Sequence, residues 1–256
     1  MKNTGRGSGA FTLIELLVVI AIIAILAAML LPTLFGVTKR AKMKRAGIEM
    51  GAIVSAIGSY DADNTLFPVS KQAITAAASA TGGAEDYTFG MDFLVTQGVT
   101  QPPMYASYQT NNAEPMAVLL DLEKYGNNVP TINAGHVKNP KRTPYLSAHF
   151  VSDTNSPGVG LDGVYRDPWG TPYLITVDLN GDGKARDAFY RSPAVSEDPN
   201  DTHTPRLGLN GLVRNANNQF ECNAPVMVWS AGPDKKIDPT VPANQGANKD
   251  NILSWK

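Results

Sequence analysis

The run DLNGDGKARD (178–187) carries the residue types of a cation-binding loop. Its start, D-x-N-x-D-G, matches the first half of a calcium-binding loop. The twelfth position of such a loop is a bidentate glutamate, whereas this chain has Phe189 there. Because Asn-Gly and Asp-Gly pairs also build hairpin turns, we favour a turn over a calcium site. The oxygen donors under either interpretation are Asp178, Asn180, Asp182 and Asp187.

No catalytic constellation is evident elsewhere. The three histidines, His136, His149 and His203, are scattered and form no H-E-x-x-H pair, and neither G-x-S-x-G nor a phosphate-binding loop of the Walker type occurs. Cys222 is the only cysteine, which excludes an intramolecular disulfide and a zinc site of several thiolates. We therefore expect no enzyme and no cofactor other than calcium.

Composition narrows the class of protein further. The chain has 256 residues, of which 43% are hydrophobic, so it can bury a sizeable core. Lys and Arg number 22 against 23 Asp and Glu, a formal net charge of -1. Nucleic-acid-binding domains usually have a strong basic excess, so no nucleic-acid partner is expected.

The N-terminal segment is long and apolar but contains one carboxylate. Between Phe11 and Leu31 only Thr12 and Glu15 are not apolar, and as a helix this segment would reach about 30 Å, the thickness of a bilayer core. It is longer than the apolar region of a cleaved signal peptide, about 7–15 residues. A carboxylate inside a membrane usually faces a partner, so Glu15 requires a cation. Cleavage just before Phe11 would create one, a new amino terminus.

The stretch AFTLIELLVVIAIIAIL resembles the N-terminus of type IV prepilins and type II secretion pseudopilins. The resemblance implies that a prepilin peptidase cuts between Ala10 and Phe11 and methylates the new terminus at Phe11. It also implies that Glu15, the fifth mature residue, pairs with the methylated amine of a neighbouring subunit during assembly. The family usually has glycine before the cut, where this chain has Ala10.

The distribution of basic residues would, by itself, place the part of the chain after the apolar segment in the cytoplasm. The positive-inside rule compares the basic residues on the two flanks, Lys2 and Arg6 before the segment against Lys39, Arg40, Lys42, Lys44 and Arg45 after it. The leader motif decides the orientation here, because the peptidase acts on the cytoplasmic face. We expect a single-pass protein of the inner membrane, in contact with lipid, whose head lies in the periplasm.

The rest of the chain predicts a helix followed by a mixed head. Ile48, Ile53, Val54, Ile57 and Tyr60 give a helix with one apolar face, Pro32 predicts a stop or kink in it, and DADNTLFP predicts its end. The run 73–87 predicts a short helix or a loop, and 115–126 a short helix. TPYLITVDLNGDGKARDAFY predicts a hairpin and PVMVWSAGPDKKIDP another strand and turn. We expect Trp169, Tyr173 and Trp255 to pack the head against the long helix.

DPWGTPY (167–173) and VWSAGPDKKID (228–238) resemble the head of the major pseudopilins of type II secretion. In that group a C-terminal loop binds calcium, which implies Asp234, Asp238 and Asp250 as ligands here. The late Gly-x-Asp-Gly loop of the group reads Gly232-Pro233-Asp234-Lys235 in this chain. The resemblance covers about residues 10–60 and 165–256, and leaves most of 64–160 without a counterpart.

The sequence therefore predicts an α+β, pilin-like fold with a small antiparallel sheet. Its expected segments are a leader (1–10), a transmembrane and amphipathic helix (11–60), a loop-rich insertion with short helices (61–164) and a β head (165–256). The resemblance implies a structural subunit of a secretion pseudopilus, with other pseudopilin subunits and an inner-membrane assembly platform as partners, ending in a periplasmic filament. A surface type IV pilin and a membrane-anchored binding or hydrolytic domain remain as alternatives.

Overall fold

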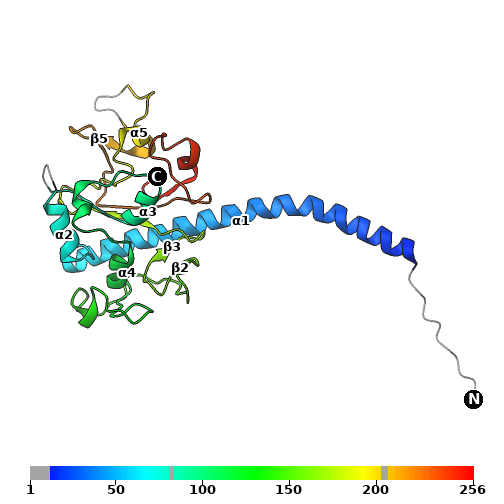
Figure 1. Cartoon of the computed structure of the whole chain (residues 1–256), viewed down its shortest axis with the longest axis horizontal. Coiled ribbons are helices and arrows are strands. Elements are labelled where there is room, and N and C mark those ends of the chain that lie inside the picture. Colours follow the sequence, from blue (N-terminus) through cyan, green and yellow to red (C-terminus); the bar gives the residue numbers. More distant parts are fainter. Residues whose placement is uncertain (1–11, 81–83, 203–206) are drawn as a thin grey trace, which may run out of the picture. The chain divides into compact units, whose positions relative to one another are not determined.

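The computed structural model describes residues 12–80, 84–202 and 207–256, and for residues 30–35, 103 and 104 it describes the backbone only. The chain forms two compact units, Met1–Ala41 and Lys42–Lys256. One long helix and a head with small antiparallel sheets make up the described part of the chain (Figure 1), which confirms the predicted α+β class.

Helix α1 (Leu13–Asn64) runs for 52 residues and belongs to both units. It ends within DADN, as predicted. Of the stop or kink predicted at Pro32, the stop is wrong, because the helix continues through this residue. The first part of α1 exposes its large apolar side chains. Those between Leu13 and Met29 have from 46% to 85% of their surface accessible to solvent. A helix that is apolar all round is normally buried by other elements, by neighbouring chains or by lipid. Within the residues whose side chains the structure describes, no helix combines the length and apolarity that crossing a bilayer requires.

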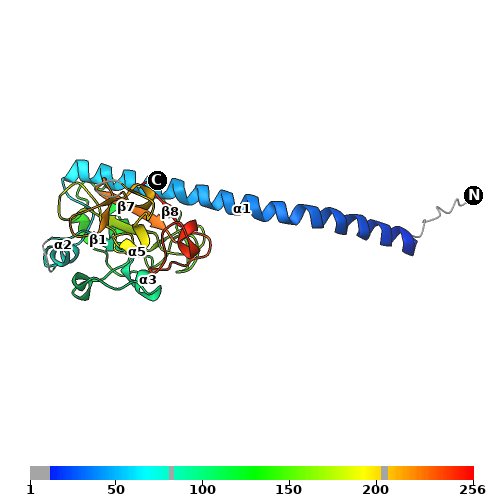
Figure 2. The same cartoon turned by 90° about the horizontal axis from the view of Figure 1, so that it is seen from above.

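The second part of α1 is amphipathic and belongs to the head. Its buried stripe consists of Ala46, Met50, Ile53, Ile57 and Tyr60, at alternating spacings of four and three residues. Figure 2 shows this end of α1 running alongside the strands of the head. The predicted apolar face is thus confirmed at Ile53, Ile57 and Tyr60, with Val54 partly buried, but the prediction was wrong for Ile48, which is exposed.

The main sheet has four antiparallel strands in the order β1-β4-β7-β8. They are β1 (Tyr87–Phe89), β4 (Leu174–Val177), β7 (Val226–Ser230) and β8 (Ile252–Leu253). The central strands LITV and VMVWS are buried at every position, as expected for strands covered on both faces. Because β1 is an edge strand of this sheet, segment 61–164 supplies part of the head's framework as well as loops and short helices.

The predicted hairpin after TPY is wrong. Strand β4 forms as expected, but its neighbours are β1 and β7, and residues 184–189 form no strand against it. The chain turns away because Ala185 exchanges two backbone hydrogen bonds with Cys222. Two further pairs of short strands occur: β2 (Gly158–Val159) with β3 (Tyr165–Arg166), and β5 (Val213–Arg214) with β6 (Phe220–Glu221).

Two short helices form within the runs 73–87 and 115–126 or close to their ends. Helix α2 (Lys71–Ala78) begins at Ser70, whose Oγ accepts the N–H of Ala73 at 3.1 Å, an ordinary N-cap. The helix expected over 115–126 is α4 (Ala113–Leu119), which begins and ends earlier because the chain turns at Asp121, where φ is +55°. The remaining helical segments are α3 (Met91–Thr96), α5 (Pro193–Ser196) and the 3-10 turns Pro103–Ala106, Ala134–His136, Leu209–Gly211 and Gly246–Asp250.

Candidate assembly and cation-binding sites

Glu15 lies in the first turn of α1 and closes a capping box with Thr12. The Thr12 N–H and hydroxyl donate to Glu15 Oε2 at 2.8 and 2.7 Å, and the Glu15 N–H donates to Thr12 Oγ1 at 3.3 Å. Such reciprocal bonds satisfy amides that the first helical turn leaves without partners. The T-x-x-E pattern before an apolar run was the sequence signal for this role of Thr12, and our sequence analysis missed it.

The two residues that flank the expected cleavage bond, Ala10 and Phe11, lie outside the described residues. What the structure adds is the environment of Glu15. The carboxylate is solvent-exposed, and its hydrogen bonds to Thr12 all use Oε2.

The run DPWGTPY forms a tight corner around the buried side chain of Asp167. Asp167 Oδ1 accepts the N–H groups of Trp169 and Thr171, and Oδ2 accepts the hydroxyls of Thr171 and Ser230, both at 2.5 Å. Burial raises the pKa of Asp167, against the lowering effect of these hydrogen bonds. Since Ser230 ends β7, the carboxylate ties the corner to the sheet. The role of this run is therefore structural.

Asp187 is separated from the other three donors of the 178–187 loop. It is almost fully buried, with Oδ2 accepting the Thr176 hydroxyl at 2.7 Å and the Trp229 Nε1–H at 3.0 Å. Its Oδ1 accepts the N–H groups of Phe189 and Tyr190. Asp187 thus joins β4 to β7 in the interior of the head.

The rest of this loop is a series of side-chain turns. Asp178 Oδ1 accepts the N–H of Gly181 and its Oδ2 that of Gly183, each at 2.7 Å. Asn180 and Asp182 accept the N–H groups two residues ahead of them, at 2.9 Å. These bonds are typical of Asx turns, and they explain the spacing without a cation.

The C-terminal loop is held by a residue that the sequence analysis did not single out, Asn248. Its Oδ1 accepts the Asp238 N–H at 2.8 Å, and its Nδ2 donates to the carbonyls of Asp238 and Val241 at 2.7 and 2.9 Å. A glycine is required at position 232, because φ is +73° and an added Cβ would lie 2.2 Å from the Asp250 carbonyl oxygen. The two ends of the loop therefore meet at Gly232 and Asp250.

The three predicted calcium ligands have different surroundings. Asp234 Oδ1 accepts the Lys236 N–H at 2.9 Å. Asp238 Oδ1 accepts the hydroxyl and the N–H of Thr240 at 2.6 and 2.8 Å, and these bonds hold the pKa of Asp238 below its ordinary value. Asp250 is the last residue of the 3-10 turn Gly246–Asp250 and lies beside Gly232. In the described ranges no three His, Cys, Asp or Glu side chains gather closely enough to hold a metal ion.

The donor chemistry of this loop nevertheless includes one buried oxygen that suits a hard cation. Within the described residues, Asn251 Oδ1 is buried without a hydrogen-bond partner, while its Nδ2 donates to the Tyr190 hydroxyl at 2.9 Å. A cation here would need this amide oxygen, backbone carbonyls and water in addition to carboxylates, a mixture that calcium accepts.

The aromatic residues expected to pack the head against α1 have mixed roles. Tyr173 is fully buried and its hydroxyl donates to Glu49 of α1, as expected. Trp169 is only half-buried, at the DPWGTPY corner. The ring of Trp255 packs edge-on against Tyr190, so the C-terminus closes onto the aromatic cluster of Tyr190, Phe189 and Trp229.

Comparisons with known proteins agree with the N-terminal pattern. Residues 5–31 match the model of the prokaryotic N-terminal methylation motif. The chain is 30% identical to type II secretion system core protein G of Escherichia coli K12 over 135 residues, which cover 53% of this chain and 78% of that protein. It is 30% identical to the protein of the same name from Aeromonas hydrophila and 31% to that from Dickeya chrysanthemi, covering 73% and 69% of them. No solved structure matches.

Proposed function

Because the chain belongs to the family of type II secretion system core protein G, we propose that it is a structural subunit of a secretion pseudopilus. The observation that carries the proposal is the first part of α1, whose apolar side chains are exposed all round in the single chain. Such a surface is stabilised by lipid before assembly and by the same helix of neighbouring subunits afterwards. The function is mechanical, and the energy comes from another component.

Processing comes first in this scheme. Prepilin peptidase cuts the Ala10–Phe11 bond and methylates the Phe11 amine, and the leader 1–10 faces the cytoplasm. Residues 11–31 hold the precursor in the inner membrane, with the head in the periplasm. The inner-membrane assembly platform then adds subunits to a periplasmic filament. These steps rest on the match of residues 5–31 to the methylation motif and on the relatives' names.

Glu15 gives the assembly its register. In the chain by itself, Thr12 holds the carboxylate through Oε2. When helices pack side by side in an apolar environment, an isolated carboxylate is costly, and the methylated amine of a neighbouring Phe11 neutralises it. A subunit that is out of register leaves both charges unpaired, so the pairing selects one axial position. Glu15 thus acts as an assembly residue and carries out no chemistry.

The test measures both steps in the cell envelope. The N-terminus and intact mass should show a chain that begins at a methylated Phe11. Glu15→Gln and Glu15→Ala should be processed and present at normal levels but should lose filaments and secretion, while Glu15→Asp should retain part of both. A chain that still begins at Met1, where the peptidase is active, would contradict processing. Surface fibres with secretion intact would indicate a type IV pilus instead.

We also propose that a calcium ion binds in the C-terminal loop by drawing together Asp234, Asp238 and Asp250, whose carboxylates do not gather around one point in the structure. The density of oxygen donors in 234–251 and the buried acceptor Asn251 Oδ1 support it. Bound calcium would neutralise carboxylates and fix the loop against β8. Calcium should raise the melting temperature of the full chain in detergent, and Asp250→Asn should abolish that rise. Equal melting curves with calcium and with chelator would contradict the site. Asp178→Asn serves as the matched control, because the 178–187 loop is the alternative.

A further inference from the structure

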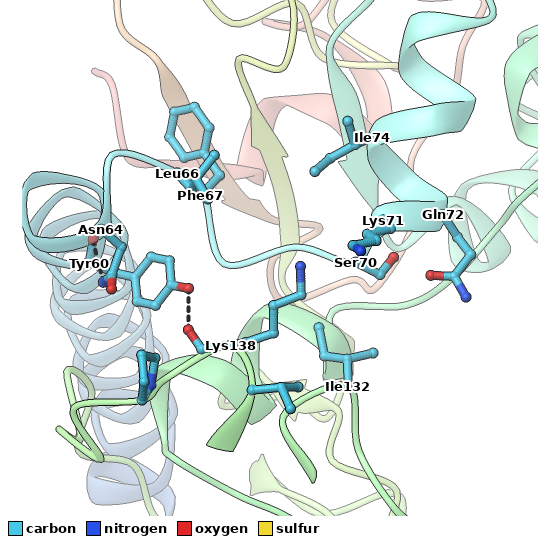
Figure 3. A pocket seen from close by; sticks show the side chains of 12 residues that line it. Tyr60, Asn64, Leu66, Phe67, Ser70, Lys71, Gln72, Ile74, Ile132 and Lys138 are labelled. Atoms are coloured by element: carbon cyan, nitrogen blue, oxygen red, sulfur yellow. Dashed lines mark hydrogen bonds between the residues drawn. The ribbon is translucent and has the colours of Figure 1, made fainter. Parts of the chain in front are cut away.

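A cleft of about 630 Å³ opens in the head between the end of α1, the segment leading into α2, and the loop 132–140. Figure 3 shows Lys71 and Lys138 pointing into the same opening, above Ile132 and beside Ile74. Leu66 and Val137 line it with 62% and 71% of their surfaces exposed. We call this surface the cationic cleft, defined by Leu66, Lys71, Ile74, Ile132, Val137 and Lys138.

Among the described residues, neither ammonium group of the cleft forms an ion pair, and Glu114 is the carboxylate that acts on Lys138 from a longer distance. In the part of the chain that the structure describes, no carboxylate lies within ion-pair distance of either Lys71 or Lys138. Burial, and then the proximity of Lys71, lowers the pKa of Lys138. Two cations outside any ion pair, beside exposed apolar side chains, suit an occupant that brings a negative charge and apolar groups together.

Hydrogen bonds fix loop 132–140, which forms one wall of the cleft. The Tyr60 hydroxyl donates to the Lys138 carbonyl at 2.6 Å, which ties loop 132–140 to α1. Asn133 fixes the same loop by accepting the N–H groups of Lys138 and Asn139. The opening is therefore preformed, so that binding there orders little additional chain.

A complementary surface lies elsewhere on the head. The loop before β2 exposes Phe150 with 52% of its surface accessible, and Leu161 after β2 is also exposed. Between them Asp153 is exposed, and hydrogen bonds from Ser156 and Asn155 hold its pKa low, so its carboxylate is charged at neutral pH. The neighbouring Asp162 is already paired with Arg166 at 2.6 Å. We call Phe150, Asp153 and Leu161 the acidic edge.

The two surfaces are formed by different segments of the head, the cationic cleft by the end of α1, the start of α2 and loop 132–140, and the acidic edge by residues on either side of β2. A surface that fits a different surface on an identical molecule makes a head-to-tail contact, which extends into an open filament when its rotation does not close. Both surfaces also belong to segment 61–164, outside the stretches that resemble the major pseudopilins.

We propose that the cationic cleft of one copy receives the acidic edge of a second copy, forming a head-to-tail contact, the lock, between heads along the filament. This inference rests on the proposed pseudopilus function, to which it adds a contact between heads. The lock places Asp153 against Lys71 and Lys138, and the apolar side chains Phe150 and Leu161 against Leu66, Ile74 and Val137. Glu15 would still set the register of the helices.

Charge reversal tests the lock in cells that assemble the wild-type filament. Lys138→Glu and Asp153→Lys should each reduce filament yield about tenfold at normal protein levels, because like charges would face each other. The double variant should restore most of the yield. Lys256→Glu, an exposed charge outside both surfaces and outside the C-terminal loop, is the matched control and should change nothing. Full assembly of both single variants, or no recovery in the double variant, would overturn the proposal.

Cysteine cross-linking gives a second measurement that does not depend on yield. The native Cys222 is buried, so a Val137→Cys, Leu161→Cys chain should form ladders of cross-linked copies. The pair Val137→Cys, Val95→Cys, whose second position is exposed on α3, should not. Glu15-dependent filaments without these ladders, or cross-links to a different protein alone, would overturn the lock and leave the pseudopilus function standing. Absence of wild-type filaments would contradict both.

Discussion

The hydroxyl of Tyr173 donates to Glu49 Oε2 at 2.5 Å and so joins the DPWGTPY corner to α1 across 124 positions of sequence. Arg45, one turn earlier on α1, donates from Nε to the other carboxylate oxygen at 2.8 Å. Tyr173 is fully buried, and its ring packs edge-on against that of Tyr165. The corner that links β3 to β4 is thereby fixed to the helix that carries the head.

This contact should contribute measurably to stability. Tyr173→Phe keeps the ring and removes the donor, which leaves Glu49 Oε2 without this partner. A hydrogen bond to a charged group contributes about 1.5–3 kcal/mol, so the free energy of unfolding should fall by that amount. Urea unfolding of the full chain in detergent, followed by circular dichroism, checks it. Arg45→Ala, which removes the more exposed partner, should cost less than about 1 kcal/mol. Equal losses for both variants would contradict this ranking.

Asp187 should be the most sensitive carboxylate of the 178–187 loop. Asp187→Ala would leave the Trp229 indole, the Thr176 hydroxyl and two backbone amides without their acceptor in the interior. We expect a loss of about 3–5 kcal/mol, because several buried donors become unsatisfied together. Thermal unfolding followed by tryptophan fluorescence measures it. Asp182→Ala, on the exposed part of the loop, should stay within about 0.5 kcal/mol. A small effect at Asp187 would mean that water enters the site.

Local patterns in the sequence were sufficient for the helices and the central strands. The apolar face of Ile53, Ile57 and Tyr60 has helical spacing, and VMVWS is a β-rich run, so each signal lies within its own element. The pairing of strands depends on distant contacts. Nothing near TPYLITV indicates that β4 pairs with residues 87–89 and 226–229, so an Asn-Gly turn signal led to a hairpin that does not form.

The same limit applies to the candidate sites. Thr12 and Glu15 are three residues apart, so their capping box was predictable from the sequence. Asp187 looked like a loop donor because its partners, Thr176 and Trp229, come from strands that only the fold brings together. Asn248 has no local pattern that marks it as a clamp, because its contacts reach back to Asp238 and Val241.

Gly170 should tolerate no side chain. Its φ is +89°, and an added Cβ would lie 2.5 Å from the Asn155 carbonyl oxygen, which is backbone and cannot rotate away. Gly181 provides a matched control, because its φ is +77° but nothing lies within 4 Å. Gly181→Ala should cost about 1 kcal/mol from backbone strain alone, and Gly170→Ala should cost at least about 2 kcal/mol more. Chemical unfolding of the two variants compares them. Equal costs would mean that the corner can shift.

Asp86 should make the stability of the head depend on pH. Asp86 is buried and directly precedes Tyr87, the residue of β1 that pairs with Val177 of β4. It lies near Asp178, and its Oδ2 accepts the Arg186 N–H at 2.7 Å. Burial is the main cause that raises its pKa from 3.8 to about 7. A carboxyl whose pKa is higher in the folded state binds its proton more tightly there. Its stabilising effect is complete below pH 3.8 and is lost as the pH rises through about 7.

Asp86→Asn tests this sign directly, because the amide keeps the acceptor and cannot ionise. The variant should match the wild type near pH 4 and exceed it at pH 8, by at most about 4 kcal/mol for three pKa units. Unfolding at pH 4, 6 and 8 measures the difference, and Asp182→Asn, exposed in the neighbouring loop, should show no such trend. A constant difference at all three pH values would indicate that hydrogen bonding, and not the charge of Asp86, is responsible.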